Sequence, residues 1–245
     1  DVALQGRALA ALGGALVHAV RGRDEEGAVV LQEAVTVATR AGDRATAVTA
    51  YRELGFVEVQ AGRRGTAASL LAKAHELAET DAELAAVLGV QGMSASDYGD
   101  YATAFSLLGS SVDLADRCAD RRQQAWSLSL VARAHLLREE RAEARTAITR
   151  SLQLVHEQRW LAFQPWPQTL LAELDIDDGD VDDAAEALEQ AWVLACQIGD
   201  PCWEGMTARG LGLLHAGRGD GAGATSWLAE AAVRSNRAPD RYQWV

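Results

Sequence analysis

The chain has 245 residues and a formal net charge of −12; 49% of its residues are hydrophobic, and four are proline. So acidic a chain argues against a nucleic-acid-binding surface, because phosphate binding needs a basic face. The longest apolar stretch, residues 8–20, contains His18 and is too short to cross a bilayer. The three cysteines are odd in number and lack CxxC spacing, which is typical of reduced thiols. We therefore expect a cytoplasmic, all-α protein.

A small–large–small triplet at positions i, i+4 and i+7 recurs along the whole chain. These three positions lie on one face of a helix, where the small residues admit a neighbouring helix and the large residue fills the gap. Successive triplets are 40, 37, 40, 40 and 40 residues apart. This period predicts stacked helix–turn–helix repeats. The triplets are Gly27/Leu31/Ala34, Ala67/Leu71/Ala74, Ala104/Leu108/Ser111, Ala144/Ile148/Ser151, Ala184/Leu188/Ala191 and Ala224/Leu228/Ala231.

Each repeat is predicted to consist of helix A, a short turn and helix B. In chain order the predicted helices span 2–20 and 25–41, 44–61 and 65–79, 81–97 and 101–118, 121–138 and 141–158, 165–177 and 181–197, and 201–216 and 221–235. We predict one domain over 1–235, with repeats 1–42, 43–79, 80–119, 120–159, 160–198 and 199–235. Residues 236–245 then begin a seventh repeat, and we expect the stack to continue in a larger protein.

Capping and turn residues support this register. Residues that can accept a hydrogen bond from the first turn precede the helices A: Asp43, Thr80, Asp120, Asp200 and Asp240. Glycines mark the predicted A–B turns: Gly62, Gly99, Gly179 and Gly219, with a longer first turn at residues 22–24.

The repeat unit resembles the tetratricopeptide repeat (TPR). Leu54-Gly55 and Leu211-Gly212 lie on helices A, each followed by a glycine-containing turn and a small–large–small helix B. The likeness covers essentially the whole chain, although the period is 40 residues instead of the family's 34. It implies a right-handed superhelix, an α-solenoid of about six repeats. HEAT repeats have a similar period, but the Leu-Gly pair and the triplet favour the TPR.

Long Ala/Arg-rich repeats of this kind resemble the C-terminal half of large ATP-dependent LuxR-type bacterial transcription regulators, which include the maltose-regulon activator. The similar stretches are Gly42-Asp43-Arg44, Trp203-Glu204-Gly205-Met206 and Pro239-Asp240-Arg241-Tyr242. The resemblance implies a region that senses an effector or partner, while separate ATPase and DNA-binding domains of the same chain perform the regulator's activity.

Motifs for metal, nucleotide or catalytic chemistry are weak in this sequence. The acidic run at 175–183 does not fit a calcium loop, and we expect it to cap the fifth helix B. Glycines at 217–223 follow no strand and lack a following Gly-Lys pair, which indicates a turn. His135 and His215 hold equivalent positions two repeats apart, which indicates packing or edge roles. We expect no metal, no cofactor and no enzymatic activity, because no nucleophile or acid–base pair is evident.

Aromatic residues gather in the fourth to sixth predicted repeats. Trp126 and Trp166 hold equivalent positions, and the TPR resemblance places helix A along the inner groove of the superhelix. By that resemblance, residues predicted to line a ligand or partner groove are Trp126, Arg133, Trp166, Glu173, Met206 and Arg209. The alternative is that the aromatic rings fill gaps between helices.

The fifth repeat breaks the pattern. Trp160 takes the position that Asp holds elsewhere, and Pro165 and Pro167 delay the start of the helix. Broken local rules often mark function, so we predict a site rim at Trp160, Phe163 and Trp203.

Two function hypotheses remain open on the sequence alone. The first is a non-enzymatic sensing module that binds a peptide, a protein or a small effector. The second is a structural scaffold or self-association module. An exposed apolar strip around Trp227, Leu228, Ala231 and Ala232 leads us to expect either a two-fold homodimer through this end or a covering tail at 242–244.

Overall fold

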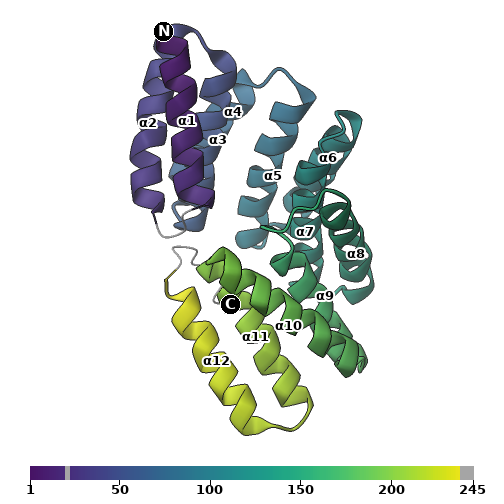
Figure 1. The fold of residues 1–245 in the computed structure, drawn as a ribbon. Helices are drawn as coiled ribbons and strands as arrows, with labels where there is room; N and C mark the ends of the chain where they lie inside the picture. The colour runs from purple at the N-terminus through teal and green to yellow at the C-terminus, as the bar shows by residue number, and fades with distance from the viewer. Residues whose placement is uncertain (20–22, 238–245) are drawn as a thin grey trace. The chain divides into compact units, whose positions relative to one another are not determined.

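The computed structural model describes residues 1–19 and 23–237, and helices are the regular secondary structure throughout this part of the chain (Figure 1). The chain divides into two compact units, Asp1–Gln123 and Gln124–Val245. The single domain predicted over 1–235 stays a prediction. The predicted first turn at 22–24 lies partly outside the described residues, and Asp240 and the predicted tail at 239–245 lie wholly outside them. No helix of the described part is both long enough and apolar enough to span a membrane.

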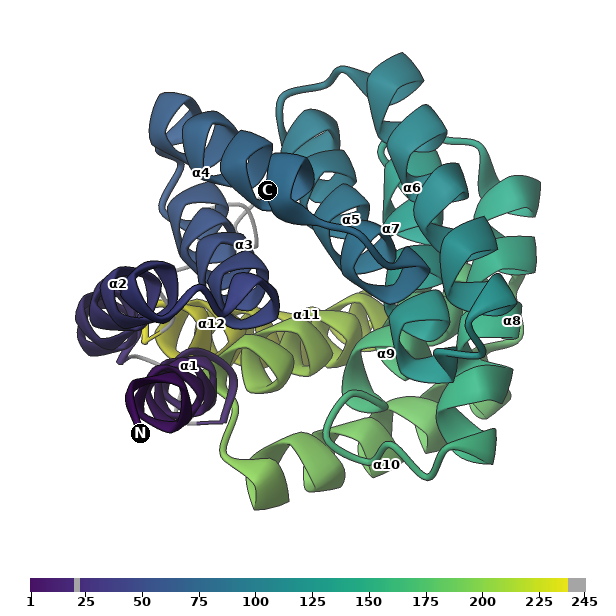
Figure 2. The same ribbon diagram turned by 90° about the horizontal axis from the view of Figure 1, so that it is seen from above.

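The first unit pairs each helix A with the following helix B. Figures 1 and 2 show α1 beside α2, α3 beside α4 and α5 beside α6. The helices are α1 (Val2–His18), α2 (Asp24–Ala41), α3 (Arg44–Gln60), α4 (Arg64–Leu77), α5 (Asp81–Asp97) and α6 (Tyr101–Arg117).

The second unit continues the same alternation, and α7 contains the boundary between the units. Its helices are α7 (Arg121–Leu136), α8 (Arg141–Glu157), α9 (Pro165–Asp178), α10 (Val181–Ile198), α11 (Pro201–Gly217) and α12 (Gly221–Ser235). Every predicted helix end in both units agrees with the observed end to within two residues.

Side chains cap the helices A where the sequence predicts. Asp43, Asp120 and Asp200 each accept a hydrogen bond from a backbone N–H of the following first turn. Thr80 and Glu83 form a reciprocal capping box at the start of α5. These bonds satisfy donors that have no partner within the helix, and they fix where each helix A begins.

The large residues of the triplets pack against glycines on helices A. A Cβ atom added at Gly55 or Gly92 would lie 2.6 Å from an atom of Leu71 or Leu108, respectively. The same relation joins Gly13 to Leu31 and Gly212 to Leu228. The leucine therefore occupies the space that a side chain on helix A would fill, which is the physical reason for the recurring Leu-Gly pair.

The triplet leucine of the fifth repeat also contributes to the junction with the next repeat. In the second unit, Leu188 of α10 forms a buried cluster with Leu211 and Leu214 of α11. A Cβ at Gly210 of α11 would lie only 2.6 Å from Leu188 Cδ2. A leucine of helix B is thus enclosed by its own helix A and by the next one, so each repeat stabilises its neighbour.

Left-handed backbone conformations recur at the turns. The four glycines predicted for the A–B turns, Gly62, Gly99, Gly179 and Gly219, all have positive φ. Three turns adopt the same geometry without glycine, at Ala119, Glu139 and Arg159. The sequence does not mark these three positions, because their residue types carry no preference for this region of backbone space.

Candidate interaction surface

The repeat pattern that the sequence breaks before α9 is also interrupted in the structure. Residues 158–164 are not helical, and α9 starts at Pro165, whose missing N–H needs no partner at that position. The Gln164 side chain makes no capping bond. Arg159 has a φ of 47°, so the chain reverses direction just before Trp160. The irregular segment therefore presents its aromatic side chains to the starts of the helices that follow.

Four aromatic rings meet at this point. Trp160 stacks on Phe163 with ring centroids 4.4 Å apart, and Trp166 stacks on Trp203 at 5.6 Å. Phe163 meets Trp166 and Trp203 edge to face, at 5.5 and 6.2 Å. Both geometries are favourable for aromatic pairs. We refer to Trp160, Phe163, Trp166 and Trp203 as the aromatic cluster.

The aromatic cluster has a buried side and an accessible side. Phe163 and Trp166 are 4% and 7% exposed, whereas Trp160 and Trp203 are partly exposed. The indole N–H of Trp203 donates to the backbone carbonyl of Ala162 at 3.1 Å, which ties α11 to the irregular segment. The cluster therefore both holds α9 against α11 and offers aromatic surface to solvent.

Polar contacts continue the junction between α9 and α11 beyond the aromatic cluster. The hydroxyl groups of Thr169 and Thr207 are 3.1 Å apart and buried. One turn further along, Arg209 donates to Glu173 Oε2 at 2.6 Å. A stacked pair, a hydroxyl pair and an ion pair thus follow one another along the two helices.

Glu173 is the electrostatically unusual group in this junction. Its side chain is 13% exposed, and its Oε1 atom is buried without a hydrogen-bond partner. Oε1 lies 3.7 Å from the position that a Cβ on Gly210 would take, so the missing side chain of Gly210 makes room for it. Burial raises the pKa of Glu173 to about 7, although the nearby guanidinium of Arg209 acts in the opposite direction.

One face of α11 remains accessible beside this junction. Trp203, Met206 and Arg209 are each partly exposed, and Leu213 is 36% exposed. Their spacing of i, i+3, i+6 and i+10 places them on the same side of the helix. We call these four residues the α11 face. It combines an indole, a thioether, a guanidinium and a leucine.

The predicted groove residues fall into two groups. Trp166, Glu173 and Arg209 meet at the α9–α11 junction together with the three predicted rim residues, while Met206 lies on the adjacent α11 face. Trp126 and Arg133 are partly buried on α7. That these residues line a binding groove stays a prediction.

The equivalent histidines bridge the turns between helices. His135 Nδ1 lies 2.7 Å from a Glu140 carboxylate oxygen, and His215 Nδ1 lies 2.8 Å from Asp220. Each contact links the end of a helix A to the residue before the next helix B. The equivalence therefore reflects a repeated turn contact, in agreement with an edge role.

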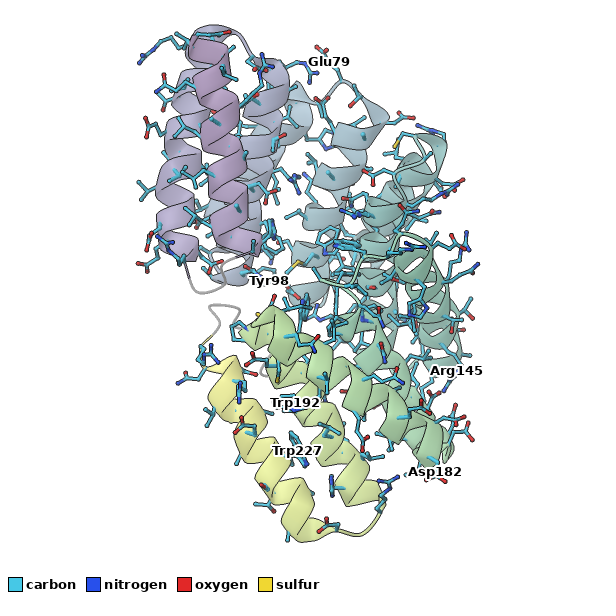
Figure 3. All side chains as sticks on the ribbon, viewed as in Figure 1. Glu79, Tyr98, Arg145, Asp182, Trp192 and Trp227 are labelled. Carbon is cyan, nitrogen blue, oxygen red and sulfur yellow. The ribbon has the colours of Figure 1, made fainter. Side chains whose placement is uncertain are left out.

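The acidic run makes ion pairs between repeats. Arg145 of α8 binds Asp175 at 2.6 Å and Asp178 at 2.8 Å, and Arg218 lies 3.4 Å from Asp182. The expected capping of α10 is only partly seen: Asp182 and Asp183 lie in its first turn, but Asp180 makes no capping bond. Arg145 and Asp182 are labelled in Figure 3. Within residues 1–19 and 23–237, no group of three or more His, Cys, Asp or Glu residues is arranged to hold a metal ion.

Two features of this surface were not predicted from the sequence. Thr169 and Thr207 look like ordinary helix residues, and their pairing joins positions 38 residues apart instead of 40. Gly210 looks like a second helix glycine next to the Leu211-Gly212 pair. A glycine directly before the Leu-Gly pair, at the place where the other repeats carry a larger side chain, is the signal that could have indicated the close approach of α9.

Solved structures show the same architecture at low sequence identity. A TM-score of 0.67 at 16% identity relates the chain to BtubC from P. vanneervenii, covering 86% of this chain and 91% of the other. The TPR-like repeats of a kinesin light chain from Podospora anserina give 0.54 at 17% identity, covering 76% and 94%. PilF of Pseudomonas aeruginosa gives 0.59 at 19% identity, covering 95% and 91%.

The fold is TPR-like. This likeness and the twelve paired helices of the described residues confirm the all-α repeat architecture expected from the sequence. No family profile matches the chain, and no curated protein matches it. The assignment of a TPR-like fold therefore depends on the likeness to solved structures and on the repeat pattern of the sequence.

Proposed function

We propose that the chain is a non-enzymatic protein-interaction module that binds a segment of a partner protein on the α11 face. The observation that carries this proposal is the row of partly exposed Trp203, Met206, Arg209 and Leu213 beside the aromatic cluster. Aromatic, methionine and arginine side chains are enriched in protein interfaces.

The dimensions of the α11 face favour a protein segment over a small effector. The ten-residue separation of Trp203 and Leu213 corresponds to about 15 Å along the helix. The buried side of the aromatic cluster fixes the position of Trp203, so little side-chain entropy is lost when a partner packs on this ring. The partner segment is expected to be apolar with an acidic group near Arg209.

The setting that we propose is the sensing region of a bacterial signal-responsive transcription regulator of the LuxR type. The support comes from the sequence resemblance of the repeats. In that setting the partner acts as a signal, and the chain's own ATPase and DNA-binding domains respond to it. A regulatory role also agrees with a surface made of interaction residues without an evident nucleophile or acid–base pair.

The proposal is tested by quantitative capture from the native host. The immobilised chain is compared with Met206→Glu, which places a carboxylate in the middle of the α11 face. A matched control, Val193→Glu, adds the same charge at an exposed apolar position on another helix, α10. We expect at least one protein to be depleted about tenfold or more by Met206→Glu and to be retained by the control. Identical capture by all three proteins would contradict the proposal.

A further inference from the structure

Arg209 belongs both to the α11 face and to the buried junction behind it. Its Nη2 atom donates to Glu173 Oε2 at 2.6 Å, which ties one side of the guanidinium to α9. The Arg209 side chain is nevertheless 42% exposed, whereas that of Glu173 is 13% exposed. A partner that packs on the α11 face can therefore reach the Arg209 guanidinium, but it meets little of the Glu173 carboxylate.

The structure confines the Glu173 carboxylate to the junction. Its Oε1 atom is buried and makes no hydrogen bond. An added Cβ on Gly210 would lie 3.7 Å from this oxygen, 2.6 Å from Leu188 Cδ2 and 3.3 Å from Thr169 Cγ2. Oε1 therefore shares the space beside Gly210 with two methyl groups, which offer no hydrogen bond to a carboxylate. The negative charge of Glu173 is compensated on its other side, through Oε2 and Arg209.

The charged groups that act on the Glu173 carboxylate come from α11 and from α9 itself. Arg209 of α11 favours the ionised form, and Asp177, one turn further along α9, favours the protonated form. Asp177 is itself paired with Arg141 of α8 at 3.1 Å, and α10 contributes the apolar Leu188 beside Gly210. Burial has the largest effect and raises the pKa of Glu173 to about 7, so the carboxylate changes its charge near neutral pH.

The charge that a partner meets at Arg209 depends on the state of Glu173. When Glu173 is ionised, it compensates the guanidinium and repels a second carboxylate brought to the same place. When Glu173 is protonated, the guanidinium keeps an uncompensated positive charge at the edge of a low-dielectric junction. An acidic side chain of a partner then supplies the compensating charge that Glu173 supplied before.

We propose that Glu173 and an acidic residue of the partner compete for Arg209, so that protonation of Glu173 strengthens binding to the α11 face. This inference rests on the proposed function and adds its regulation. Binding of the acidic residue takes up a proton, and by the same coupling the bound partner favours the protonated form of Glu173. Binding is therefore stronger at pH 6 than at pH 8.

Peptide binding at two pH values tests the competition. Peptides from a random library displayed on phage are selected on the immobilised chain at pH 6, and clones that also bind Met206→Glu are discarded. Selected peptides without histidine are synthesised with an acetylated N-terminus, and fluorescence anisotropy gives the Kd at pH 6 and pH 8. For the wild type we expect a Kd about fivefold or more lower at pH 6. The control Glu189→Gln, at an exposed position of α10, should show the same pH dependence.

Three substitutions isolate the two carboxylates and the guanidinium. Glu173→Gln is uncharged at both pH values, so its Kd should stay within about twofold of the wild-type value at pH 6. Arg209→Gln should weaken binding at pH 6 and remove the pH dependence, because no guanidinium is left to share. Replacing the acidic residue of the peptide by its amide should do the same with the wild-type protein. This last comparison leaves the protein unchanged, so it does not depend on how the variants fold.

The outcomes distinguish this inference from the proposed function. Peptides that Met206→Glu fails to bind, but that bind the wild type equally at pH 6 and pH 8, would overturn the competition and leave the proposed function intact. A pH dependence that persists in Glu173→Gln or with the amide peptide would also overturn the competition. Selection of no peptide that distinguishes the wild type from Met206→Glu would overturn both.

Discussion

Glu173 places a carboxylate between α9 and α11 in surroundings that favour its protonated form. Its Oε1 atom has no partner, and burial outweighs the attraction of Arg209. The pKa is raised from 4.5 to about 7, so the folded protein binds this proton more tightly than the unfolded chain does. The associated stability is fully present below pH 4.5 and is lost as the pH rises towards 7.

Substituting Glu173 by Gln should remove this pH dependence. A pKa raised from 4.5 to about 7 corresponds to about 3 kcal/mol. The free energy of unfolding of the wild type, relative to that of Glu173→Gln, should therefore fall by roughly that amount between pH 4.5 and 8. Urea unfolding at several pH values measures the difference, and Glu189→Gln, at an exposed position of α10, serves as the control. Parallel curves for the wild type and Glu173→Gln would show that Glu173 titrates normally.

At the scale of the element, the helices and the triplet faces were predictable because they depend on local spacing. Capping residues fix the helix starts, and the recurring small–large–small pattern identifies which face packs. All the triplet leucines before Leu228 are at most 2% exposed, as their register requires. These features repeat with the chain and can be read by aligning it with itself.

The contacts across the α9–α11 junction were not predictable in the same way. They join Trp166 to Trp203 and Glu173 to Arg209, which are 37 and 36 residues apart. Equivalent positions in these repeats are 40 residues apart, so neighbouring helices A meet with an offset of about one turn. Self-alignment of the sequence shows which positions are equivalent, and it contains no information about this offset.

The packing of leucine on glycine predicts opposite effects for two Gly→Ala substitutions. At Gly92 of α5 the new Cβ would lie 2.6 Å from Leu108 Cγ, and Leu108 is fully buried. We expect Gly92→Ala to destabilise the protein by about 1–3 kcal/mol despite the better helix propensity of alanine. At Gly109 of α6 no atom lies within 4 Å of an added Cβ, so Gly109→Ala should stabilise by up to about 1 kcal/mol.

Thermal and urea unfolding of the two variants measure this difference. Helix propensity alone would stabilise both proteins equally, so only a packing constraint at Gly92 separates them. Equal stabilisation by Gly92→Ala and Gly109→Ala would contradict the proposed packing of Leu108 on helix A.

At the scale of the whole molecule, different faces of the helices stabilise the fold and are available for binding. The triplets and the Leu-Gly pairs bury one side of every hairpin, and this leaves other helix faces free to vary. The α11 face is such a surface. It mixes aromatic, methionine and arginine side chains, which are enriched in interfaces between proteins.

The most direct test of the proposed interaction surface is site-specific photo-crosslinking in the native host. A photoreactive phenylalanine analogue is introduced at Met206 or Leu213 on the α11 face, and at Val193 and Val29 as exposed control positions. We predict that positions 206 and 213 crosslink to the same partner protein, while positions 193 and 29 do not. Crosslinks to that protein with equal yield from position 193, or the absence of any partner from positions 206 and 213, would contradict the proposal.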